Sequence, residues 1–355
     1  MKILSVIGAR PEFVKEGPLS RELRKRHTEI IIHTGQHYDY EMSKVFFGDL
    51  KIPEPDYNLE VGSGTHGKQT GEMLIKLEEV FLKEKPDIVI VAGDTNTTIA
   101  GALSASKLGI KIAHVESGMR SFDKTMPEEI NRVLTDHISN ILFCSTETAV
   151  LNLRKESINE NVFNVGDIMI DAIKENIGIA EKKSTILKKL GLKSKSYIIA
   201  TVHRASNTDN KENLGSIIGA LAQSKEKIVF PLHPRTEKYL KSYGLFNKLK
   251  SSNITITKPL GYLDMLVLEK NSRKILTDSG GIQKEAYFFG VPCITFRDTT
   301  EWVETVENGY NKLVGTDARK ISDAIKSFEG NKKSIQLYGN GDAGRKIVEI
   351  ISKQS

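Results

Sequence analysis

Residues 275–287 read "ILTDSGGIQKEAY", a short apolar run that passes through Thr-Asp-Ser and two glycines into a helix-like segment. Consecutive glycines cost conformational entropy, so this turn must need a backbone without side chains. A tight turn alone would explain one glycine, whereas a phosphate group lying against the amide groups would explain both. The stretch therefore predicts a strand, a candidate phosphate-binding turn and a helix, in that order.

Similar apolar runs, rich in Ile and Val and followed by helix-like stretches, recur along the whole chain. They are continuous rather than alternating, which is typical of parallel strands whose two faces are both covered by helices. Their order predicts an α/β protein with two consecutive doubly wound domains. The predicted strands are 2–8, 29–35, 87–93, 111–116, 141–145 and 162–166, then 197–203, 227–233, 253–257, 274–280, 292–296 and 312–315.

The chain of 355 residues is longer than one hydrophobic core usually supports, so two domains are expected. A polar, lysine-rich helical stretch near 167–195 marks the change between them. We place the domains at 1–168 and 169–339, followed by an amphipathic helix at about 340–355 that carries Ile347, Ile350 and Ile351 on one face. The residues alone suggest only that this helix caps the second domain.

Composition excludes several classes of protein. No apolar run approaches the about 20 residues of a membrane-spanning helix, and the N-terminal stretch enters a strand pattern without a signal-peptide cleavage signature, so we expect a cytoplasmic protein with no membrane association. The formal net charge is +6, but Lys and Arg are interspersed with Glu, which argues against nucleic-acid binding and fits a polyanionic small ligand equally well. Cys144 and Cys293 lie in apolar runs and are expected to be buried, without a disulfide or a metal.

Polar clusters follow the predicted strands, at the edge where parallel sheets bind ligands. In "GARPEFVK" (8–15), Arg10 and Lys15 lie near a helix start and suit a phosphate, although they could be ordinary solvated cations. Asp94 follows the strand 87–93 and could instead be the N-cap of the next helix. If the two domains face each other, these clusters line one cleft, so we expect an interdomain active site.

Further titratable residues lie at the same edge. His114 and Glu116 alternate across a strand end, which places them on one face with Glu116 at the rim. Glu128 and Glu129 begin a helix, where either could only balance the helix dipole. His203 ends a strand at a position too polar for a core, although a structural histidine remains the alternative.

Two other interpretations are weak. The stretch "GSGTHG" (62–67) matches a dinucleotide-binding fingerprint, but it follows a poor strand and is not in the first βα unit. His33 and His37 straddle a turn, and neither Cys nor a carboxylate cluster completes a ligand set. We therefore expect neither a cofactor nor a metal.

The polar clusters, taken in order, resemble the signatures of the non-hydrolysing UDP-N-acetylglucosamine 2-epimerases, and the resemblance covers nearly the whole chain. It implies the GT-B architecture, with two Rossmann-like domains facing across a cleft and a C-terminal helix that crosses back to the first domain. It also implies a homodimer. The matching stretches are "GARPEFVK", "TGQH", "GDTNTT", "HVESGMRS", "MPEEINR", "TVHRASN", "PLGYLDM", "LTDSGGIQKEA", "RDTTE", "KLVGTD" and "YGNGDAGRKI".

The resemblance implies a reaction that interconverts UDP-GlcNAc and UDP-ManNAc by inverting C2 of the sugar, through elimination of UDP to a 2-acetamidoglucal and its re-addition, without a nicotinamide. It assigns the catalytic roles to Asp94, Glu116, Glu128 and His203. The resemblance assigns the binding of the UDP-sugar to Arg10, Lys15, His233, Leu260, Met265, Ser279, Gly280, Gly281 and Glu285.

This sequence departs from many bacterial members of the family at Trp302, where "TEWVE" stands in place of "TERPE". The amino-acid sequences of 34–47 and 62–74 also differ from those usual in the family, which leaves open whether UDP-GlcNAc acts as an allosteric activator. A UDP-2,3-diacetamido uronic acid is an alternative substrate. The rival activities are a GT-B glycosyltransferase, a hydrolysing epimerase and a nucleotide-binding module without turnover.

Overall fold

The computed structural model describes residues 1–36, 52–250, 253–331 and 336–354, apart from the side chains of Arg10 and Lys250. The chain forms two compact units, which we call the first unit (Met1–Glu175 with Gln336–Ser355) and the second unit (Asn176–Ile335). Helix α7 (Ile168–Lys183) contains the point at which the chain passes from one to the other. Both units are built on parallel sheets, so the predicted fold class, α/β with two Rossmann-like domains, is confirmed.

The first unit holds a seven-stranded parallel sheet in the order β3-β2-β1-β4-β5-β6-β7. Its strands pair in register, for example Ile3 with Glu29 on one side and with Ile88 on the other. Apolar residues fill the strands on both faces, as parallel strands between helix layers require. The strands are β1 (Lys2–Ile7), β2 (Thr28–His33), β3 (Tyr57–Asn58), β4 (Ile88–Ala92), β5 (Lys111–Ser117), β6 (Ile141–Cys144) and β7 (Val162–Asn164).

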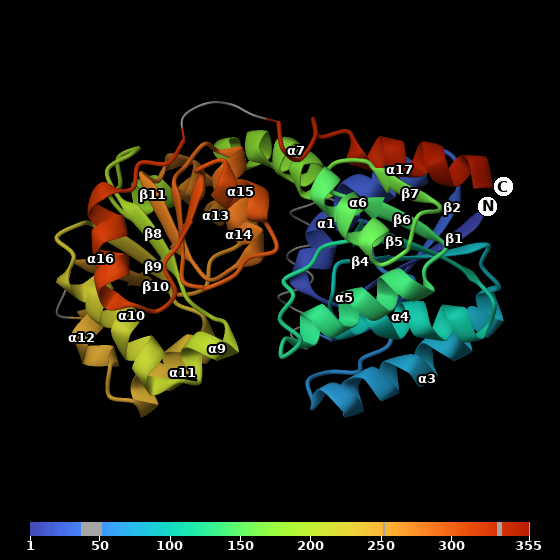
Figure 1. The fold of residues 1–355 in the computed structure, drawn as a ribbon, viewed down its shortest axis with the longest axis horizontal. Coiled ribbons are helices and arrows are strands. Elements are labelled where there is room, and N and C mark those ends of the chain that lie inside the picture. The colour runs from blue at the N-terminus through green and yellow to red at the C-terminus, as the bar shows by residue number, and fades with distance from the viewer. Residues whose placement is uncertain (37–51, 251–252, 332–335, 355) are drawn as a thin grey trace. The chain divides into compact units, whose positions relative to one another are not determined.

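Two hydrophobic cores cover the two faces of this sheet. One joins the strands to α1 and α17, and the other joins them to α3 and α4. The C-terminal helix α17, red in Figure 1, packs beside α1 and buries Ile347, Val348 and Ile351. The C-terminal helix therefore belongs to the first unit, as the resemblance predicts. The helices are α1 (Arg10–Leu23), α3 (His66–Glu84), α4 (Asn96–Lys107), α5 (Pro127–Ile138), α6 (Glu147–Lys155) and α17 (Ala343–Ile351), which the 3-10 turn η1 (Ser352–Gln354) follows.

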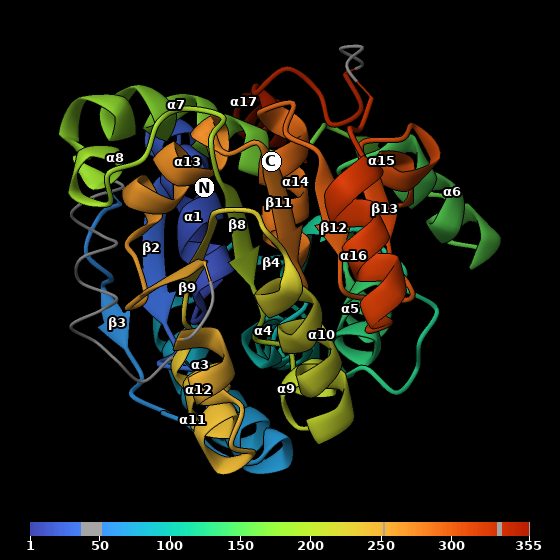
Figure 2. The same ribbon diagram turned by 90° about the vertical axis from the view of Figure 1, so that its left-hand side faces the viewer.

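The second unit repeats this plan with a six-stranded parallel sheet in the order β10-β9-β8-β11-β12-β13. Helices α10 and α16 lie side by side over one face of it, as Figure 2 shows, and share one core with the strands. The strands are β8 (Ile198–Thr201), β9 (Ile228–Pro231), β10 (Ile254–Thr257), β11 (Lys274–Thr277), β12 (Cys293–Thr295) and β13 (Asn311–Leu313).

The helices of the second unit connect these strands and lie on both sides of the sheet (Figure 2). They are α8 (Ile186–Lys189), α9 (Ala205–Thr208), α10 (Lys211–Gln223), α11 (Pro234–Ser242), α12 (Phe246–Lys250), α13 (Tyr262–Asn271), α14 (Gly280–Phe288), α15 (Val303–Glu307) and α16 (Ala318–Ser327). Within the described ranges, no helix is both long and apolar enough to traverse a bilayer.

Every strand predicted from the sequence is present and parallel. The two-residue edge strand β3 was not predicted, because a strand of this length leaves no run of apolar residues. Cys144 and Cys293 are buried free thiols, as predicted. Burial raises the pKa of each thiol to about 12.

Candidate functional site

The strand order of the first sheet reverses between β1 and β4, so the loops that follow these two strands diverge to opposite sides. Doubly wound sheets bind their ligands at such a switch point, beyond the carboxyl ends of the strands. The predicted residues Lys15, Asp94 and Glu128 come from the loops and helices that follow β1, β4 and β5, and Glu116 lies near the carboxyl end of β5 itself. The topology therefore collects the carboxylates of the first unit at one edge of one sheet.

The start of α1 is closed by its own chain. The carboxylate of Glu12 accepts hydrogen bonds from the amides of Gly8 and Ala9, at 2.6 and 2.9 Å. Burial raises the pKa of Glu12, although its hydrogen bonds to Thr95 and to these two amides act in the opposite direction. Because Glu12 occupies these two amides, they are not available to an anion at this helix start. Arg10 begins the helix, but its side chain lies outside the described part of the structure.

Lys15 and Glu116 form a buried ion pair between α1 and the end of β5. Glu116 has a backbone φ of 71°, next to a bulge that shifts the pairing of β5 with β6 between Val115 and Ser117. Left-handed backbone is unfavourable for a residue with a side chain, so this conformation requires support from its surroundings. Gly93 supplies the space: a Cβ there would lie 3.1 Å from the Lys15 ammonium group. The geometry thus aims the Glu116 carboxylate at Lys15.

Asp94 forms an ion pair with Arg132 of α5, and Asn131 donates a 3.0 Å hydrogen bond to the Asp94 backbone oxygen. The Arg132 side chain is 3% exposed, whereas that of Asp94 is 35% exposed. The N-cap of α4 is Thr95, which accepts from the amide of Thr98. The interpretation of Asp94 as the N-cap is therefore wrong, and its carboxylate is held by a fixed cation instead.

Glu128 and Glu129, which the sequence could not separate, have different surroundings. Glu129 is buried and accepts hydrogen bonds from the amides of Ser121 and Phe122 and from the Ser121 hydroxyl, each at 2.9 Å, and it also pairs with Arg132. Glu128 is half-exposed, and within the described ranges no hydrogen bond or ion pair engages it. Glu129 therefore anchors the loop after β5, while the Glu128 carboxyl is available.

In the second unit, the strand order reverses between β8 and β11. Asp278, which follows β11, is fully buried and accepts hydrogen bonds from the amides of His203 and Arg204 and from the side chain of Asn207. The Nδ1 atom of His203 lies 3.4 Å from Asp278 Oδ1. The His233 ring packs beside that of His203, with centroids 5.7 Å apart. A buried carboxylate thus fixes the loop that carries His203.

Helix α14 begins at this edge with open amides. Ser279 is its N-cap, and the amides of Gly280 and Gly281 have no hydrogen-bond partner among the described residues. A Cβ on Gly280 would lie 3.3 Å from the indole nitrogen of Trp302, whereas one on Gly281 would meet only the Ser279 hydroxyl, at 3.9 Å. Free amides at a helix start suit an anion.

Trp302 and Lys284 adjoin this helix start. Lys284, one turn into α14, is 2% exposed, and its ammonium group lies 4.0 Å from the centroid of the Trp302 ring. Trp302 is itself buried. The residue at which this sequence departs from the bacterial pattern therefore packs directly against the first glycine of the turn.

Three further predicted residues lie in the second unit at distinct places. Glu285 is buried one turn into α14, and Leu260 is half-buried in the loop after β10. Met265 is buried in α13, where its amide donates to Gly261 at 3.0 Å. Their predicted contacts with a nucleotide remain predictions.

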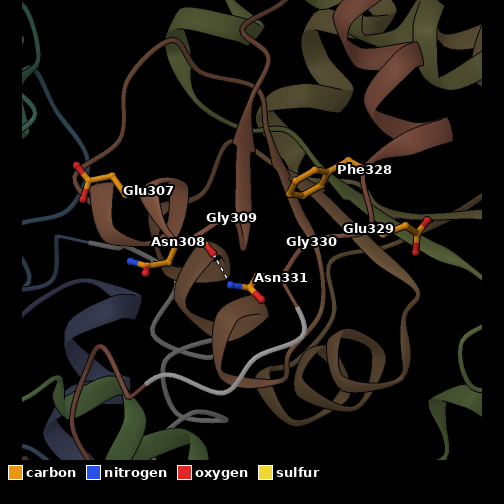
Figure 3. Close-up of a pocket in the computed structure, with 7 residues that line it drawn as sticks. All are labelled: Glu307, Asn308, Gly309, Phe328, Glu329, Gly330 and Asn331. Atoms are coloured by element: carbon orange, nitrogen blue, oxygen red, sulfur yellow. Dashed lines mark hydrogen bonds between the residues drawn. The ribbon is translucent and has the colours of Figure 1, made fainter.

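A shallow pocket in the second unit, with a volume of about 590 Å³, is lined by none of these residues (Figure 3). Its walls come from the segment before β13 and the segment after α16, at the amino ends of the strands. Lys274 pairs with Glu329 on its wall at 3.1 Å. Parallel sheets bind ligands at the opposite edge, so we do not assign the active site to this pocket. It is lined by Glu307, Asn308, Gly309, Phe328, Glu329, Gly330 and Asn331.

The residues considered for a metal do not assemble in the described part of the chain, where no group of three or more His, Cys, Asp or Glu side chains could hold an ion. His33 stacks on Phe13 at 5.1 Å and lies 3.3 Å from Asn58 Oδ1, whereas His37 is outside the described residues. The stretch 62–67 follows the edge strand β3 and enters the start of α3, where the Nδ1 atom of His66 lies 3.3 Å from Asn96 Oδ1.

Arg132, Asp136 and Asp278 were not predicted as site residues, yet they hold predicted residues in place. Asp278 stands at the end of a continuous apolar run, and a charged residue at the last buried position of a strand is a signal that could have found it. Arg132 and Asp136 lie one helical turn apart on the buried face of α5. Charged residues on the inner face of an amphipathic helix would have been the corresponding signal.

The chain matches the family model described as UDP-N-acetylglucosamine 2-epimerase over residues 21–352. A Methanococcus maripaludis "UDP-N-acetylglucosamine 2-epimerase homolog" is 59% identical over 99% of each chain. The Pseudomonas aeruginosa "UDP-2,3-diacetamido-2,3-dideoxy-D-glucuronate 2-epimerase" is 48% identical over 99% of this chain and 100% of its own.

The fold is likewise similar to that of a solved structure. The crystal structure of the Methanocaldococcus jannaschii UDP-GlcNAc 2-epimerase in complex with UDP-GlcNAc and UDP superposes with a TM-score of 0.95. The two chains are 50% identical, and the superposition covers 99% of this chain and 100% of that one. The likeness therefore extends over both units.

Proposed function

Because the chain belongs to the UDP-N-acetylglucosamine 2-epimerase family, we propose that it interconverts UDP-GlcNAc and UDP-ManNAc by inverting C2 of the sugar. The observation that carries the proposal is the set of carboxylates at the switch point of the first unit, two of them held by cations and one available. Such a set suits proton transfer at carbon, and sugar transfer to an acceptor has no need of it.

The C2 proton of the sugar is not acidic, since no carbonyl adjoins it in the ring. Its removal is coupled to the departure of UDP from C1: the C2–H and C1–O bonds break, a C1–C2 double bond forms, and UDP leaves with the electron pair of the C1–O bond. The product is a 2-acetamidoglucal. Addition of a proton to the other face of C2 and of UDP to C1 gives the epimer, so the reaction needs no net oxidation.

The groups of the first unit suit the two proton transfers. Asp94 and Glu116 each pair with a fixed cation, Arg132 and Lys15, which favours oriented carboxylates that can accept a proton. Glu128 lies half-exposed without a partner among the described residues, so it is free to approach a ligand. Groups in such different surroundings can divide the acid and base roles between them.

The groups of the second unit suit the leaving group. The open amides of Gly280 and Gly281, with the Ser279 hydroxyl, would hold the pyrophosphate as charge develops on it. His203, whose loop Asp278 fixes, and the neighbouring His233 would add donors. The family resemblance adds Arg10 for the nucleotide, Glu285 for the ribose, and Leu260 and Met265 for the uracil.

A second substrate is favoured by a specific observation. The similarity to the Pseudomonas aeruginosa diacetamido glucuronate epimerase, at 48% identity, is close to that of the solved UDP-GlcNAc epimerase, at 50%. The uronate differs from UDP-GlcNAc by a carboxylate at C5 and an acetamido group at C3. The ratio of kcat/KM for the two sugars decides between them.

Incubation with UDP-GlcNAc in D2O tests the reaction itself. Epimerisation introduces deuterium at C2, and both epimers approach equilibrium without an acceptor. A glycosyltransferase would leave C2 unlabelled, a hydrolysing epimerase would release free ManNAc and UDP irreversibly, and a binding module would bind UDP without turnover. Absence of label after exhaustive incubation with both sugars would reject the proposal.

The resemblance also predicts a homodimer in the cytoplasm. Sedimentation equilibrium tests the first part, because a dimer doubles the mass of 39.5 kDa. Fractionation of the source cells tests the second.

A further inference from the structure

His114, near the end of β5, lies between two hydrogen-bond acceptors. Its side chain is fully buried. The Nδ1 atom lies 2.7 Å from Asp136 Oδ1, and the Nε2 atom lies 2.8 Å from the backbone oxygen of Gly93. A carbonyl oxygen can only accept a hydrogen bond, so Nε2 must carry the hydrogen. Whether Nδ1 carries a second one depends on the state of Asp136.

Asp136 is surrounded by donors. Its Oδ2 atom accepts from the amide of Gly118 at 3.1 Å and from Arg120 Nη1 at 2.7 Å. Both of these donors engage the same oxygen, and the fixed charge of Arg120 pairs with it, which is the geometry of an ionised carboxylate. A carboxylate is only an acceptor, so Nδ1 of His114 must carry a hydrogen as well.

We infer that His114 is a buried imidazolium, protonated on both ring nitrogens, and that it is a positioning residue for the loop that carries Asp94. The charge is compensated within the first unit. Arg120 donates to both oxygens of Glu156 at 2.7 Å, so charges alternate along His114, Asp136, Arg120 and Glu156. A buried charge with paired and hydrogen-bonded neighbours avoids most of the cost of desolvation.

The imidazolium fixes Gly93 through the backbone carbonyl of that residue. The amide of Gly93 donates to the backbone oxygen of Val115 at 3.0 Å, while its own carbonyl accepts from His114. Both polar groups of this residue are therefore held by β5. Gly93 directly precedes Asp94 and faces the pair of Lys15 and Glu116, so His114 supports the proposed proton-transfer groups without touching them.

The same contact orients an amide toward the ligand edge. In a trans peptide group the C=O and N–H bonds point in opposite directions. The Gly93 carbonyl points at buried His114, so the N–H of Asp94 in the same peptide group points away from it. This N–H has no partner among the described residues. A charged donor on the carbonyl polarises the peptide and strengthens the N–H as a donor, which we assign to an oxygen of the bound sugar nucleotide.

The protonation state is measurable without substrate. In full-length protein labelled with 15N-histidine, one of the eight histidines should show two protonated ring nitrogens at pH 7, and this signal should vanish in His114→Gln. Neutron diffraction from wild-type crystals locates the same hydrogens if the variant does not fold. A His114 ring with one bare nitrogen would overturn the inference.

The positioning role, which rests on the proposed function, is tested by two matched variants. The amide of His114→Gln can reach the place of Nε2 and donate to Gly93, whereas His114→Asn can reach only the place of Nδ1. Since misplacement of a catalytic group by ~1 Å costs about 100-fold in rate, we expect kcat to fall about 100-fold in His114→Asn and by about tenfold or less in His114→Gln. KM should change less than kcat.

His27→Gln, at the amino end of β2, serves as the control and should keep wild-type kcat. Equal losses in the two His114 variants, or no loss in either, would reject the positioning role while leaving deuterium incorporation by the wild type, and hence the proposed function, untouched. Thermal unfolding of both variants verifies that the compared proteins are folded.

Discussion

The two sheets share one strand order around their switch points, but they use different chemistry there. In the first unit, Glu12 occupies the amides after β1, and two carboxylates at the edge, Glu116 and Asp94, are paired with Lys15 and Arg132. In the second, the carboxylate of Asp278 turns inward to hold backbone amides, and the amides at the start of α14 stay open. Topology thus decides where a site lies, while the local side chains decide whether it handles protons or anions.

The largest expected effect falls on the carboxylates of the first unit. Glu116→Gln should lower kcat by about 10²–10⁴, because it removes a group that transfers protons, while UDP affinity measured by calorimetry stays near wild type. Exposed Glu160→Gln is the control and should leave both values unchanged. A parallel loss of UDP affinity would contradict the assignment of proton transfer to the first unit and of UDP binding to the second.

The next effect concerns the open amides of the second unit. Gly281→Val places a side chain over the start of α14, where a Cβ would meet only the Ser279 hydroxyl, at 3.9 Å, so the fold should survive. Loss of one hydrogen bond to a charged group costs about 1.5–3 kcal/mol, so the Kd for UDP should rise by about 10- to 150-fold. Gly178→Val on α7, with nothing within 4 Å, is the matched control.

At saturating substrate, the exchange of C2 hydrogen in Gly281→Val should also be slower than in the wild type, because the amide stabilises the charge that develops on UDP as it leaves. A wild-type rate of exchange would mean that the start of α14 binds UDP without assisting its departure.

The pair of Glu128 and Glu129 sharpens the comparison within the first unit. Glu128→Gln should lower kcat strongly without changing the urea midpoint. Glu129→Gln should destabilise the protein by about 1–3 kcal/mol, because it weakens a buried acceptor of three hydrogen bonds and an ion pair. Near-normal turnover in Glu128→Gln would transfer the proposed role to Glu129.

The smallest effect concerns how the first unit is closed by its C-terminal helix. Asp171 on α7 accepts hydrogen bonds from the amides of Ala343 and Gly344 at the start of α17. Burial raises the pKa of Asp171 to about 6; the two amides lower it, and Asp167 and Asp342 raise it further. The pKa of Asp171 in the folded protein exceeds its unfolded pKa of about 3.9. The contribution of Asp171 to the free energy of unfolding is therefore fully present below the unfolded pKa and is lost as the pH rises through 6.

Asp171→Asn removes this titration. The free energy of unfolding of the variant, relative to wild type, should increase between pH 4.5 and pH 7.5 by at most about 3 kcal/mol. Exposed Asp323→Asn should show no such change. A difference that does not depend on pH would contradict the raised pKa.

The fold was predictable because continuous apolar runs mark buried parallel strands, and only β3 lacks such a run. The division of the chain is less visible in the sequence, since α7 continues without a break across the point where the units meet in the chain, and the predicted domains 1–168 and 169–339 remain a proposal about independent folding.

The sequence allowed the residues of the candidate site to be predicted, but it did not allow their hydrogen-bond and ion-pair partners to be predicted as well. A sequence places Asp94 after a strand, but only the folded chain brings Arg132 of α5 to it and gives the N-cap to Thr95. The paired glycines also have a reason that sequence cannot supply. Neither has a left-handed φ, and Gly280 is small because Trp302 packs against it.

Because α17 follows the second unit in the sequence, it affects the order in which the two units can finish folding. Most of the first unit precedes the second unit in the polypeptide, yet one of its cores is completed by Ile347, Val348 and Ile351, which are synthesised after the whole second unit. The second unit, contained within a continuous stretch, can finish folding while the first still exposes the apolar surface of α1 and its sheet. The unit that is made first is therefore the last to become complete, and it must be kept from aggregating until then.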